Sequence, residues 1–362
     1  MSGFALKGLL RPELAELRAY LPHAGDFRIR LDANEAPPLL PAAARERLAA
    51  AFAELGLERY PDPTASDLRH AIAARLAVGA DEVLVGVGSD ELIGLLLTVL
   101  VAPTPGAVMS VVTSTPSFVM YKMSARVRGQ RVLEVPLDAE WDVAADGLLR
   151  AIEMSQASVA FIASPNNPTG TLASMERLRR VIEAAPNTLI VIDEAYIDYA
   201  GCDHLELYRR YPNVILLRTL SKIGFAALRV GWLVARPELS AELDKARQPY
   251  NLNAVSQRLA SVVLAELAEP VAAAIAVVVS ERERVAAELV SLPGVTVTPS
   301  RANFLWLCTE RAAGDVFDAL CQRGILVRSF HERGGRLAHQ LRVTIGTPAE
   351  NDELIRCLRE VT

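Results

Sequence analysis

The chain has few of the residue types that bind metal ions or form redox pairs. Its 362 residues include five histidines, none in an HxH or HxxxH pair, so we expect no metal site. No two cysteines form a CxxC motif, which argues against a redox pair or a zinc knuckle. Low cysteine use is typical of the reducing cytoplasm. The cysteines are Cys202, Cys308, Cys321 and Cys357.

An excess of positive charge and a long apolar run are also missing. The formal net charge is −5 and the pI is near 5.7, which argues against a nucleic-acid partner. The most apolar early run, Leu92–Val101, is too short to span a bilayer and predicts a buried helix. Residues Met1–Lys7 lack a basic region followed by a hydrophobic core. We therefore expect no signal peptide, no membrane partner and a cytoplasmic location.

What the chain does contain is a regular alternation of strand-like and helix-like segments. The strand-like runs are continuously apolar, as expected for strands buried on both faces. The alternation predicts an α/β fold with a mostly parallel, doubly wound sheet, where ligands bind beyond the carboxyl ends of the strands. The predicted strands are Val83–Gly86, Ala107–Val112, Val159–Ala163, Thr188–Ile192, Val214–Leu217 and Val230–Val234, and the helices are Ser89–Val101, Ser117–Arg128, Ser174–Ala184 and Cys202–Tyr211.

The pattern changes after about Tyr250, which predicts a second, smaller α+β domain. We expect residues 1–45 to form an N-terminal segment that packs with this small domain. Residues 46–250 would form the large domain and residues 251–362 the small one, with a linking helix at Pro41–Leu55. The elements predicted for the small domain are a long helix at Ala254–Leu292, a helix at Ala312–Cys321, and strands at Val295–Val297, Phe304–Leu307, Leu326–Arg328 and Leu341–Thr344.

The most informative segment is Arg218–Gly231, where a lysine follows an apolar strand. Lys222 comes soon after Val214–Leu217, and burying a lysine is costly. A partly desolvated amine has a lowered pKa and can attack an aldehyde to form a Schiff base. Nearby hydroxyls and Arg229 would suit an anionic phosphate on that aldehyde, a combination that suggests pyridoxal phosphate. The alternative is a lysine that reaches solvent from a strand end.

Polar groups also follow two other predicted strands. Asp193 ends an apolar strand and could keep a pyridinium nitrogen protonated, while Tyr196 could donate its hydroxyl to a phenolate oxygen. Asn167, in the Ser164–Gly170 turn, can point its amide into a cleft, or the segment can be an ordinary turn. A strand-end acid also suits magnesium in nucleotide hydrolases, but the GxxxxGK[ST] loop that this reading requires is absent.

Each of the remaining candidates also has an ordinary structural interpretation. Ser89 and Asp90 lie at a strand-to-helix junction whose free N–H groups could bind a phosphate, and Ser89 could equally cap the helix. Phe118 could stack on a planar ring or pack in the core. Arg328 and Arg342 end strand-like runs, where either could clamp a carboxylate or phosphate, or form a surface salt bridge.

Taken together, these motifs resemble the fold-type I pyridoxal-phosphate aminotransferases, and within them the histidinol-phosphate aminotransferase family. The resemblance runs in order along nearly the whole chain. It implies a large domain with a mostly parallel seven-stranded sheet and a smaller α+β domain. The matching segments are Leu31–Glu35, Arg59–Pro63, Gly86–Glu91, Ser164–Gly170, Ile192–Tyr196, Arg218–Lys222, Leu228–Gly231 and Leu341–Thr347.

The resemblance also implies residue roles. Lys222 would carry pyridoxal 5'-phosphate as a Schiff base and, once displaced, move the proton during transamination, with Asp193 and Tyr196 as the other catalytic residues. Tyr60 would reach the cofactor phosphate of the neighbouring subunit, so the working unit would be a homodimer. The implied cofactor-binding residues are Lys222, Ser89, Asp90, Phe118, Asn167, Asp193, Tyr196, Thr219, Ser221, Arg229 and Tyr60. The implied substrate-binding residues are Tyr20, Asn34, Tyr250, Arg328 and Arg342.

The implied reaction transfers the amino group of L-histidinol phosphate to 2-oxoglutarate. The products would be imidazole-acetol phosphate and L-glutamate, a step of histidine biosynthesis. An aromatic amino-acid aminotransferase and a threonine-phosphate decarboxylase use similar motifs and stay open as alternatives. A regulator that kept the fold but lost the chemistry is less expected, because the lysine is present and only about 45 residues precede the large domain.

Overall fold

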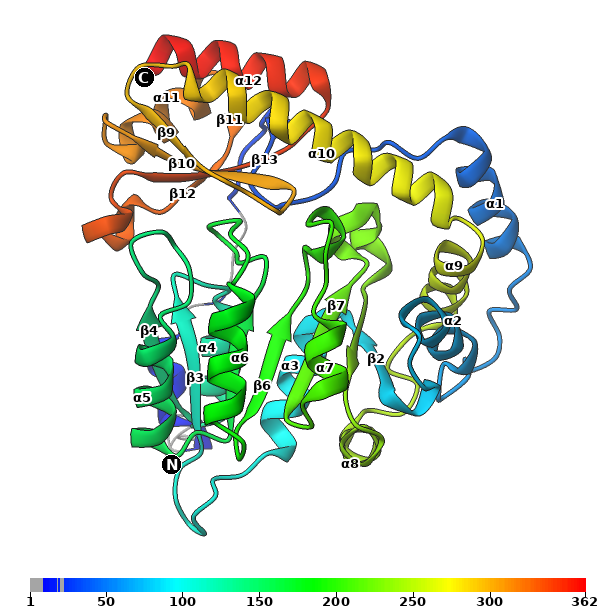
Figure 1. Cartoon of the computed structure of the whole chain (residues 1–362). Coiled ribbons are helices and arrows are strands. Elements are labelled where there is room, and N and C mark those ends of the chain that lie inside the picture. The colour runs from blue at the N-terminus through cyan, green and yellow to red at the C-terminus, as the bar shows by residue number, and fades with distance from the viewer. Residues whose placement is uncertain (1–8, 18, 20–22) are drawn as a thin grey trace, which may run out of the picture.

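The computed structural model describes residues 9–17, 19 and 23–362, and its largest element is a seven-stranded sheet (Figure 1). The strands lie in the order β2-β8-β7-β6-β5-β3-β4, and only β8 runs antiparallel to its neighbours. This confirms the predicted α/β class and the mostly parallel sheet. The strands are β2 (Val83–Val87), β3 (Ser110–Thr115), β4 (Arg131–Pro136), β5 (Val159–Ala163), β6 (Leu189–Asp193), β7 (Val214–Thr219) and β8 (Val230–Val234).

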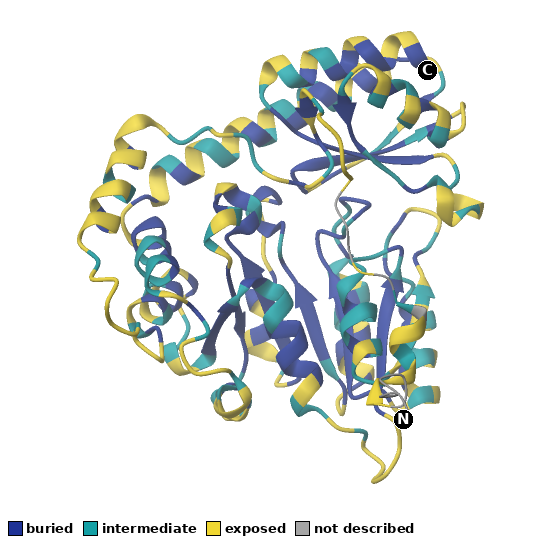
Figure 2. Ribbon diagram, turned by 180° about the vertical axis from the view of Figure 1, so that it is seen from behind, coloured by how far each residue is buried: buried dark blue, intermediate teal, exposed yellow. Residues whose placement is uncertain are grey.

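Helices cover both faces of this sheet, which explains the continuous apolar runs. Along β6, Ile190 and Ile192 face one core cluster and Val191 faces the other, because successive strand side chains point to opposite sides. Figure 2 shows the central strands buried and the helices that flank them exposed on their outer surfaces. One face carries α5 (Ala145–Ser155), α6 (Met175–Ala184) and α7 (Leu205–Arg210), and the other carries α3 (Gly88–Val99), α4 (Met120–Val127) and α8 (Pro237–Ala246).

The strand β4 is the element of this sheet that no apolar run predicted. It lies at the sheet edge, and its residues are half-buried or exposed rather than buried. An edge strand packs on one side only, so it needs no continuous apolar run. The antiparallel direction of β8 was also not predicted, because a buried apolar run does not report the direction of a strand.

A second, four-stranded antiparallel sheet lies above the first in Figure 1, in the order β12-β13-β10-β9. A separate pair joins β1 to β11 in parallel, so a segment from the start of the chain packs beside this sheet. The expected boundaries at residues 45 and 250 stay predictions. The elements here are β1 (Ile29–Arg30), β9 (Val295–Thr298), β10 (Phe304–Thr309), β11 (Ile325–Leu326), β12 (Arg328–Ser329), β13 (Gln340–Thr344), α11 (Ala313–Gln322) and α12 (Pro348–Val361).

The helix predicted at Ala254–Leu292 is broken in two. It forms α9 (Ala254–Ala265) and α10 (Ala268–Val290), which meet at an angle of 80°. Pro270 has no N–H to continue the ladder from α9, and it is tolerated because it lies in the first turn of α10. Within the described residues, no single helix is long and apolar enough to cross a membrane, and only this bent pair passes that test together. The remaining helices are α1 (Ala42–Ala53) and α2 (Ser66–Leu76).

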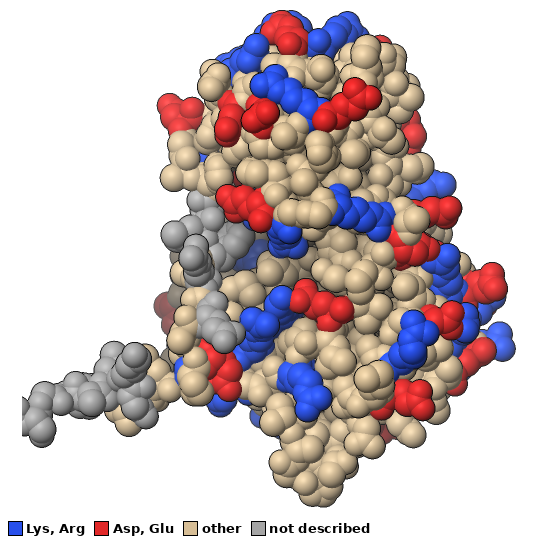
Figure 3. Space-filling view, turned by 90° about the vertical axis from the view of Figure 1, so that its left-hand side faces the viewer, with Lys and Arg blue, Asp and Glu red and all other residues tan. Residues whose placement is uncertain are grey.

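Charged side chains of both signs are interspersed on the face shown in Figure 3. Many of them form ion pairs at the surface, such as Arg180 with Asp146 and Arg179 with Glu206. Exposed pairs of this kind contribute little to stability.

Candidate active site

A cavity of about 230 Å³ lies between the carboxyl ends of the central strands and the second sheet. Its walls come from strand ends and turns that are far apart in sequence, as expected for a doubly wound sheet. Most of the predicted site residues line it. They are Asn34, Ser89, Asp90, Phe118, Asn167, Asp193, Tyr196, Thr219, Ser221, Lys222, Arg229, Arg328 and Arg342.

Lys222 lies in a tight turn directly after β7. Its side chain is half-buried, and Nζ donates to the carbonyl oxygen of Ala33 at 3.4 Å. The hydroxyl of Tyr199 donates to the Lys222 carbonyl at 2.6 Å, which fixes the backbone of the turn. Gly224 completes the turn with a φ of 102°, a left-handed value that a side chain would disfavour. The amine therefore points into the cavity and has one weak protein acceptor.

Asp193 ends β6 with a carboxylate that is almost fully buried. Oδ2 accepts from the Tyr121 hydroxyl at 2.6 Å, and Oδ1 accepts from the backbone N–H of Ala195 at 3.0 Å. Burial raises the pKa of Asp193 to about 6, although both hydrogen bonds act in the opposite direction. A buried carboxylate of this kind gains most from a cationic partner. It is well placed to hold a proton on a ring nitrogen in the cavity.

The Asn167 amide and the Tyr196 hydroxyl are each oriented by a hydrogen bond from a neighbouring side chain. Arg342 Nη1 donates to Asn167 Oδ1 at 2.6 Å, which leaves the Asn167 NH₂ group as the donor toward the cavity. Asn34 Nδ2 donates to the Tyr196 hydroxyl at 2.9 Å, so the Tyr196 proton is available for another acceptor. Both groups can donate to the same type of ligand atom, an anionic oxygen.

The start of α3 forms an anion-binding concavity with the turn after β7. Arg229 Nη1 donates to Ser221 Oγ at 3.4 Å, and Nη2 lies 3.6 Å from Asp90 Oδ2. The first N–H groups of α3 lie beside these side chains, where the helix dipole favours negative charge. Thr219 Oγ1 donates to Ser221 Oγ at 2.9 Å and holds that hydroxyl in place.

Two glycines make this concavity possible. A Cβ on Gly231 would lie 2.5 Å from the backbone nitrogen of Ser89, so the strand and the helix start could not approach each other. A Cβ on Gly88, whose φ is 73°, would lie 2.6 Å from Arg229 Nη2. The missing side chains therefore let the start of α3 and Arg229 approach each other closely, which brings donor groups together for a phosphate.

A buried cluster of charged side chains forms around Glu194, the residue after Asp193. The Glu194 carboxylate accepts from Arg218 Nε at 2.6 Å and lies 2.9 Å from His204 Nδ1. Burial works against the charged form, yet His204 and Arg218 together hold the pKa of Glu194 below its usual value. Because Glu194 follows Asp193 directly, the cluster fixes the backbone that presents the catalytic candidate.

Two of the predicted site residues do not line this cavity, and a third lies outside the described residues. Tyr60 and Tyr250 stack on each other outside it, with ring centroids 4.6 Å apart, and Tyr60 is 81% exposed. Tyr20 lies outside the described residues. An exposed tyrosine pair is available to a second copy of the chain.

The structure also brings in residues that the sequence did not single out. Tyr121, the partner of Asp193, is fully buried, and its ring stacks on Phe161 at a centroid distance of 4.8 Å. Its position three residues after Phe118, with the two rings edge to face at 5.5 Å, is a signal that could have pointed to it. Asp32, Phe330 and Arg333 also line the cavity.

Comparisons with known proteins agree with this geometry. The model of the family "Aminotransferase class I and II" matches residues 28–358. The chain belongs to this aminotransferase family. It is 38% identical to histidinol-phosphate aminotransferase 1 of Burkholderia lata over 97% of both chains. It is also 38% identical to histidinol-phosphate aminotransferase 1 of Carboxydothermus hydrogenoformans, over 96% of this chain and 97% of the other.

Solved structures give the same result for the fold of the aminotransferase. Histidinol-phosphate aminotransferase from Sinorhizobium meliloti, in complex with pyridoxal-5'-phosphate, matches with a TM-score of 0.85 at 26% identity. The match covers 100% of this chain and 98% of that one. The enzyme from Clostridium acetobutylicum matches with a TM-score of 0.83 at 22% identity, over 92% and 98%. The resemblance to fold-type I aminotransferases is thus confirmed.

Pyridoxal 5'-phosphate is the cofactor of this family, and the cavity of this aminotransferase fits it. A concavity lined by helix N–H groups, Ser221 and Arg229 suits the phosphate, and the buried Asp193 suits the ring nitrogen. Lys222 offers an amine in the same cavity. The residues that line the cavity therefore include donors for the phosphate, a carboxylate for the ring nitrogen and an amine for the aldehyde.

Proposed function

We propose that this aminotransferase transfers the amino group of L-histidinol phosphate to 2-oxoglutarate. The products are imidazole-acetol phosphate and L-glutamate. The observation that carries the proposal is the pair Arg328 and Arg342, which face each other across β12 and β13 and both line the cavity that holds Lys222. The names of the curated relatives, which the chain matches over nearly its full length, support it.

The arginines explain how one site can accept two different anions. Histidinol phosphate carries a phosphate and no α-carboxylate, whereas 2-oxoglutarate carries two carboxylates. Guanidinium groups bind both kinds of anion with paired hydrogen bonds. Arg342 is 7% exposed and already oriented by Asn167, so it presents a fixed donor surface to either substrate.

The chemistry is divided among four residues of the chain. When bound, pyridoxal phosphate supplies an electron sink for the charge left at the substrate α-carbon. Asp193 holds the proton on the ring nitrogen, and its burial makes that pairing strong. Lys222 Nζ is the cavity amine that can take the α-carbon proton and give it back. Tyr196 and Asn167 donate hydrogen bonds that orient the reacting groups.

We also propose that the working unit is a homodimer in which Tyr60 of one copy reaches the cavity of the other. Tyr60 is exposed and lies outside its own cavity, stacked on Tyr250. Its loop is nevertheless rigid, because Asp62 accepts from Thr64 and Ser66 and the Gln257 amide donates to the Asp62 carbonyl. A rigid loop that presents an exposed aromatic ring suits contact with another subunit.

A substrate panel tests the proposed reaction. With 2-oxoglutarate as acceptor, we expect kcat/KM for histidinol phosphate to exceed that for phenylalanine at least about 100-fold, since phenylalanine cannot pair with the distal arginine. Glutamate formation is measured for each donor, and CO₂ release is measured with threonine phosphate. A preference for phenylalanine, or decarboxylation of threonine phosphate as the main activity, would overturn the assignment.

A further inference from the structure

The segment between β12 and β13 brings an additional arginine to the cavity. Arg333 ends the short turn His331–Arg333 and lines the same cavity as Lys222 and Arg328. Gly334 and Gly335 follow with φ values of 64° and 53°, so the chain turns sharply here. Nothing in the matching sequence segments assigns a role to Arg333, and it does not end a strand.

The electrostatic surroundings of Arg333 are unfavourable without a bound anion. Its guanidinium has no hydrogen bond or ion pair with residues 9–17, 19 and 23–362, and the same holds for Arg328. Burial and the like charge of Arg328 lower the pKa of Arg333, and the attraction of Glu134 and a place over the Phe330 ring, 5.5 Å from its centroid, offset this only in part. Arg342, in contrast, already donates to Asn167. Two cations that repel each other and line the same cavity can therefore share an anionic ligand.

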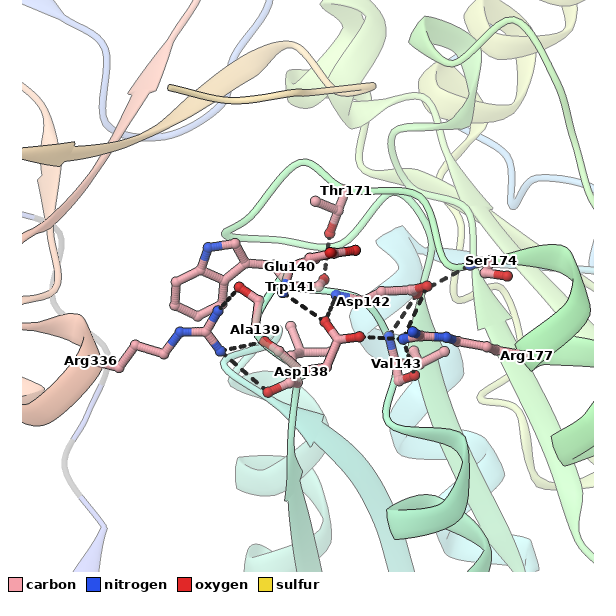
Figure 4. Close-up of polar contacts among 11 residues, drawn as sticks. Asp138, Ala139, Glu140, Trp141, Asp142, Val143, Thr171, Ser174, Arg177 and Arg336 are labelled. Carbon is pink, nitrogen blue, oxygen red and sulfur yellow. Dashed lines mark hydrogen bonds and ion pairs between the residues drawn. The ribbon is translucent and has the colours of Figure 1, made fainter. Parts of the chain in front are cut away.

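The position of Arg333 is fixed by its neighbour Arg336. The Arg336 guanidinium lies 3.4 Å above the ring centroid of Trp141 and donates to the carbonyl of Leu137 at 3.3 Å and to that of Asp138 (Figure 4). Because Trp141 belongs to the loop after β4, these contacts tie the segment of the small sheet to the large one. Arg333 is thus held over the cavity rather than on a free loop.

The loop that receives Arg336 is itself rigid. Asp138 Oδ1 accepts from the backbone N–H groups of Glu140 and Asp142, both at 2.9 Å. Arg177 forms ion pairs with Asp138, at 2.5 Å, and with Asp142, at 3.3 Å (Figure 4). A braced loop on one side and a stacked arginine on the other give Arg333 a defined position, which specific recognition requires.

We propose that Arg333 is a specificity-determining residue that, together with Arg328, binds the phosphate of the amino donor. The proposal rests on the proposed function, in which the donor carries a phosphate. Phosphate suits the pair better than a carboxylate, because it has about two negative charges and three acceptor oxygens for two guanidinium groups.

Kinetics of the holoenzyme test this role. In Arg333→Ala we expect KM for histidinol phosphate to rise about tenfold, the loss of about one charge-assisted hydrogen bond, with kcat within about twofold. KM for phenylalanine stays unchanged, because phenylalanine has no distal anion. The inhibition constant of inorganic phosphate against the donor rises by the same factor. Arg333→Lys recovers part of the loss, since it keeps the charge but not the paired donors.

Matched variants and the wild type separate the two proposals. Arg150→Ala removes an exposed arginine of α5 outside the cavity and should change none of these constants. Unchanged KM and phosphate inhibition in Arg333→Ala, with a wild type active on histidinol phosphate, would overturn the role of Arg333 alone. A wild type inactive on histidinol phosphate would overturn the proposed function. Phosphate inhibition of the activity that remains would then decide the role of Arg333.

Discussion

The floor and the rim of the cavity are built on opposite principles. The floor, which we define as Tyr121, Asp193, Thr219 and Ser221, is at most 7% exposed, and each of these side chains has a hydrogen-bond partner within the fold. The rim, which we define as Arg328 and Arg333, lies on a two-residue strand and a three-residue turn. Within the described residues, neither guanidinium has a hydrogen bond or ion pair, and Arg333 only lies over the Phe330 ring, 5.5 Å from its centroid.

In the proposed reaction, the floor contacts the cofactor, which every turnover uses, whereas the rim contacts the substrates, which change when the amino donor is replaced by the acceptor. The cofactor stays in place, so its donors can be fixed in advance by buried hydrogen bonds, which removes reorganisation at the moment of reaction. The substrates alternate between a phosphate and a dicarboxylate. A rim of unpaired guanidinium groups can bind either anion without a competing internal partner.

Loss of the cavity amine, Lys222, should have the largest effect. In Lys222→Ala we expect turnover to fall at least about 10²- to 10⁴-fold, because the cavity loses the group that moves the α-carbon proton. The visible absorbance of covalently bound cofactor should also disappear. Lys245→Ala is the control, since it removes an exposed lysine of α8 that pairs with Glu242. Ordinary transamination rates in Lys222→Ala would contradict the assigned role.

The buried acid of the floor should destabilise the protein when the cofactor is absent. The pKa of Asp193 is raised to about 6 in the fold, while an unfolded aspartate titrates near 4. As pH rises through this window, the unfolded state loses its proton first, so the free energy of unfolding decreases, by up to about 3 kcal/mol. The penalty is absent below the unfolded pKa and complete above about pH 7.

Replacing Asp193 should therefore have opposite effects on the stability of the cofactor-free and the cofactor-bound protein. Cofactor-free Asp193→Asn should unfold at higher urea concentration than wild type near pH 8, and the difference should shrink toward pH 4. In the cofactor-bound protein the order should reverse, because the ionised carboxylate gains its cationic partner. Asp26→Asn, an exposed position, is the control. A stability difference that does not vary with pH would contradict this account.

The sequence predicted the cavity residues that follow strands better than it predicted the rim, for physical reasons. Lys222, Asp193 and Ser89 follow buried strands, and the strand ends of a parallel sheet meet at one edge, so a linear pattern becomes a three-dimensional site. Tyr121 was not predicted because its partner lies 72 positions away, and no local pattern records that contact. The identity of the family followed from the ordered motifs rather than from any one of them.

The rim depends on turns and on contacts between the two sheets. Arg328 could be chosen because it ends an apolar run, but Arg333 lies in a polar, glycine-rich turn that resembles an ordinary surface loop. Its place at the cavity depends on Arg336 and Trp141, which are almost two hundred positions apart. Such contacts are set by tertiary packing, which periodicity and propensity do not report.

The smallest effect is expected where the rim is tied to the large sheet. Arg336→Ala removes the stacking on Trp141 and the hydrogen bonds to backbone carbonyls, so the free energy of unfolding should decrease by about 1 kcal/mol. KM for histidinol phosphate should rise about threefold, less than in Arg333→Ala, because Arg333 is still present but less well positioned. Arg336→Lys should behave more like alanine than like arginine, since an ammonium cannot stack and donate as a planar group. Urea unfolding and steady-state kinetics measure both quantities. A KM that rises more in Arg336→Ala than in Arg333→Ala would mean that Arg336 itself binds the phosphate. The rim would then consist of Arg328 and Arg336.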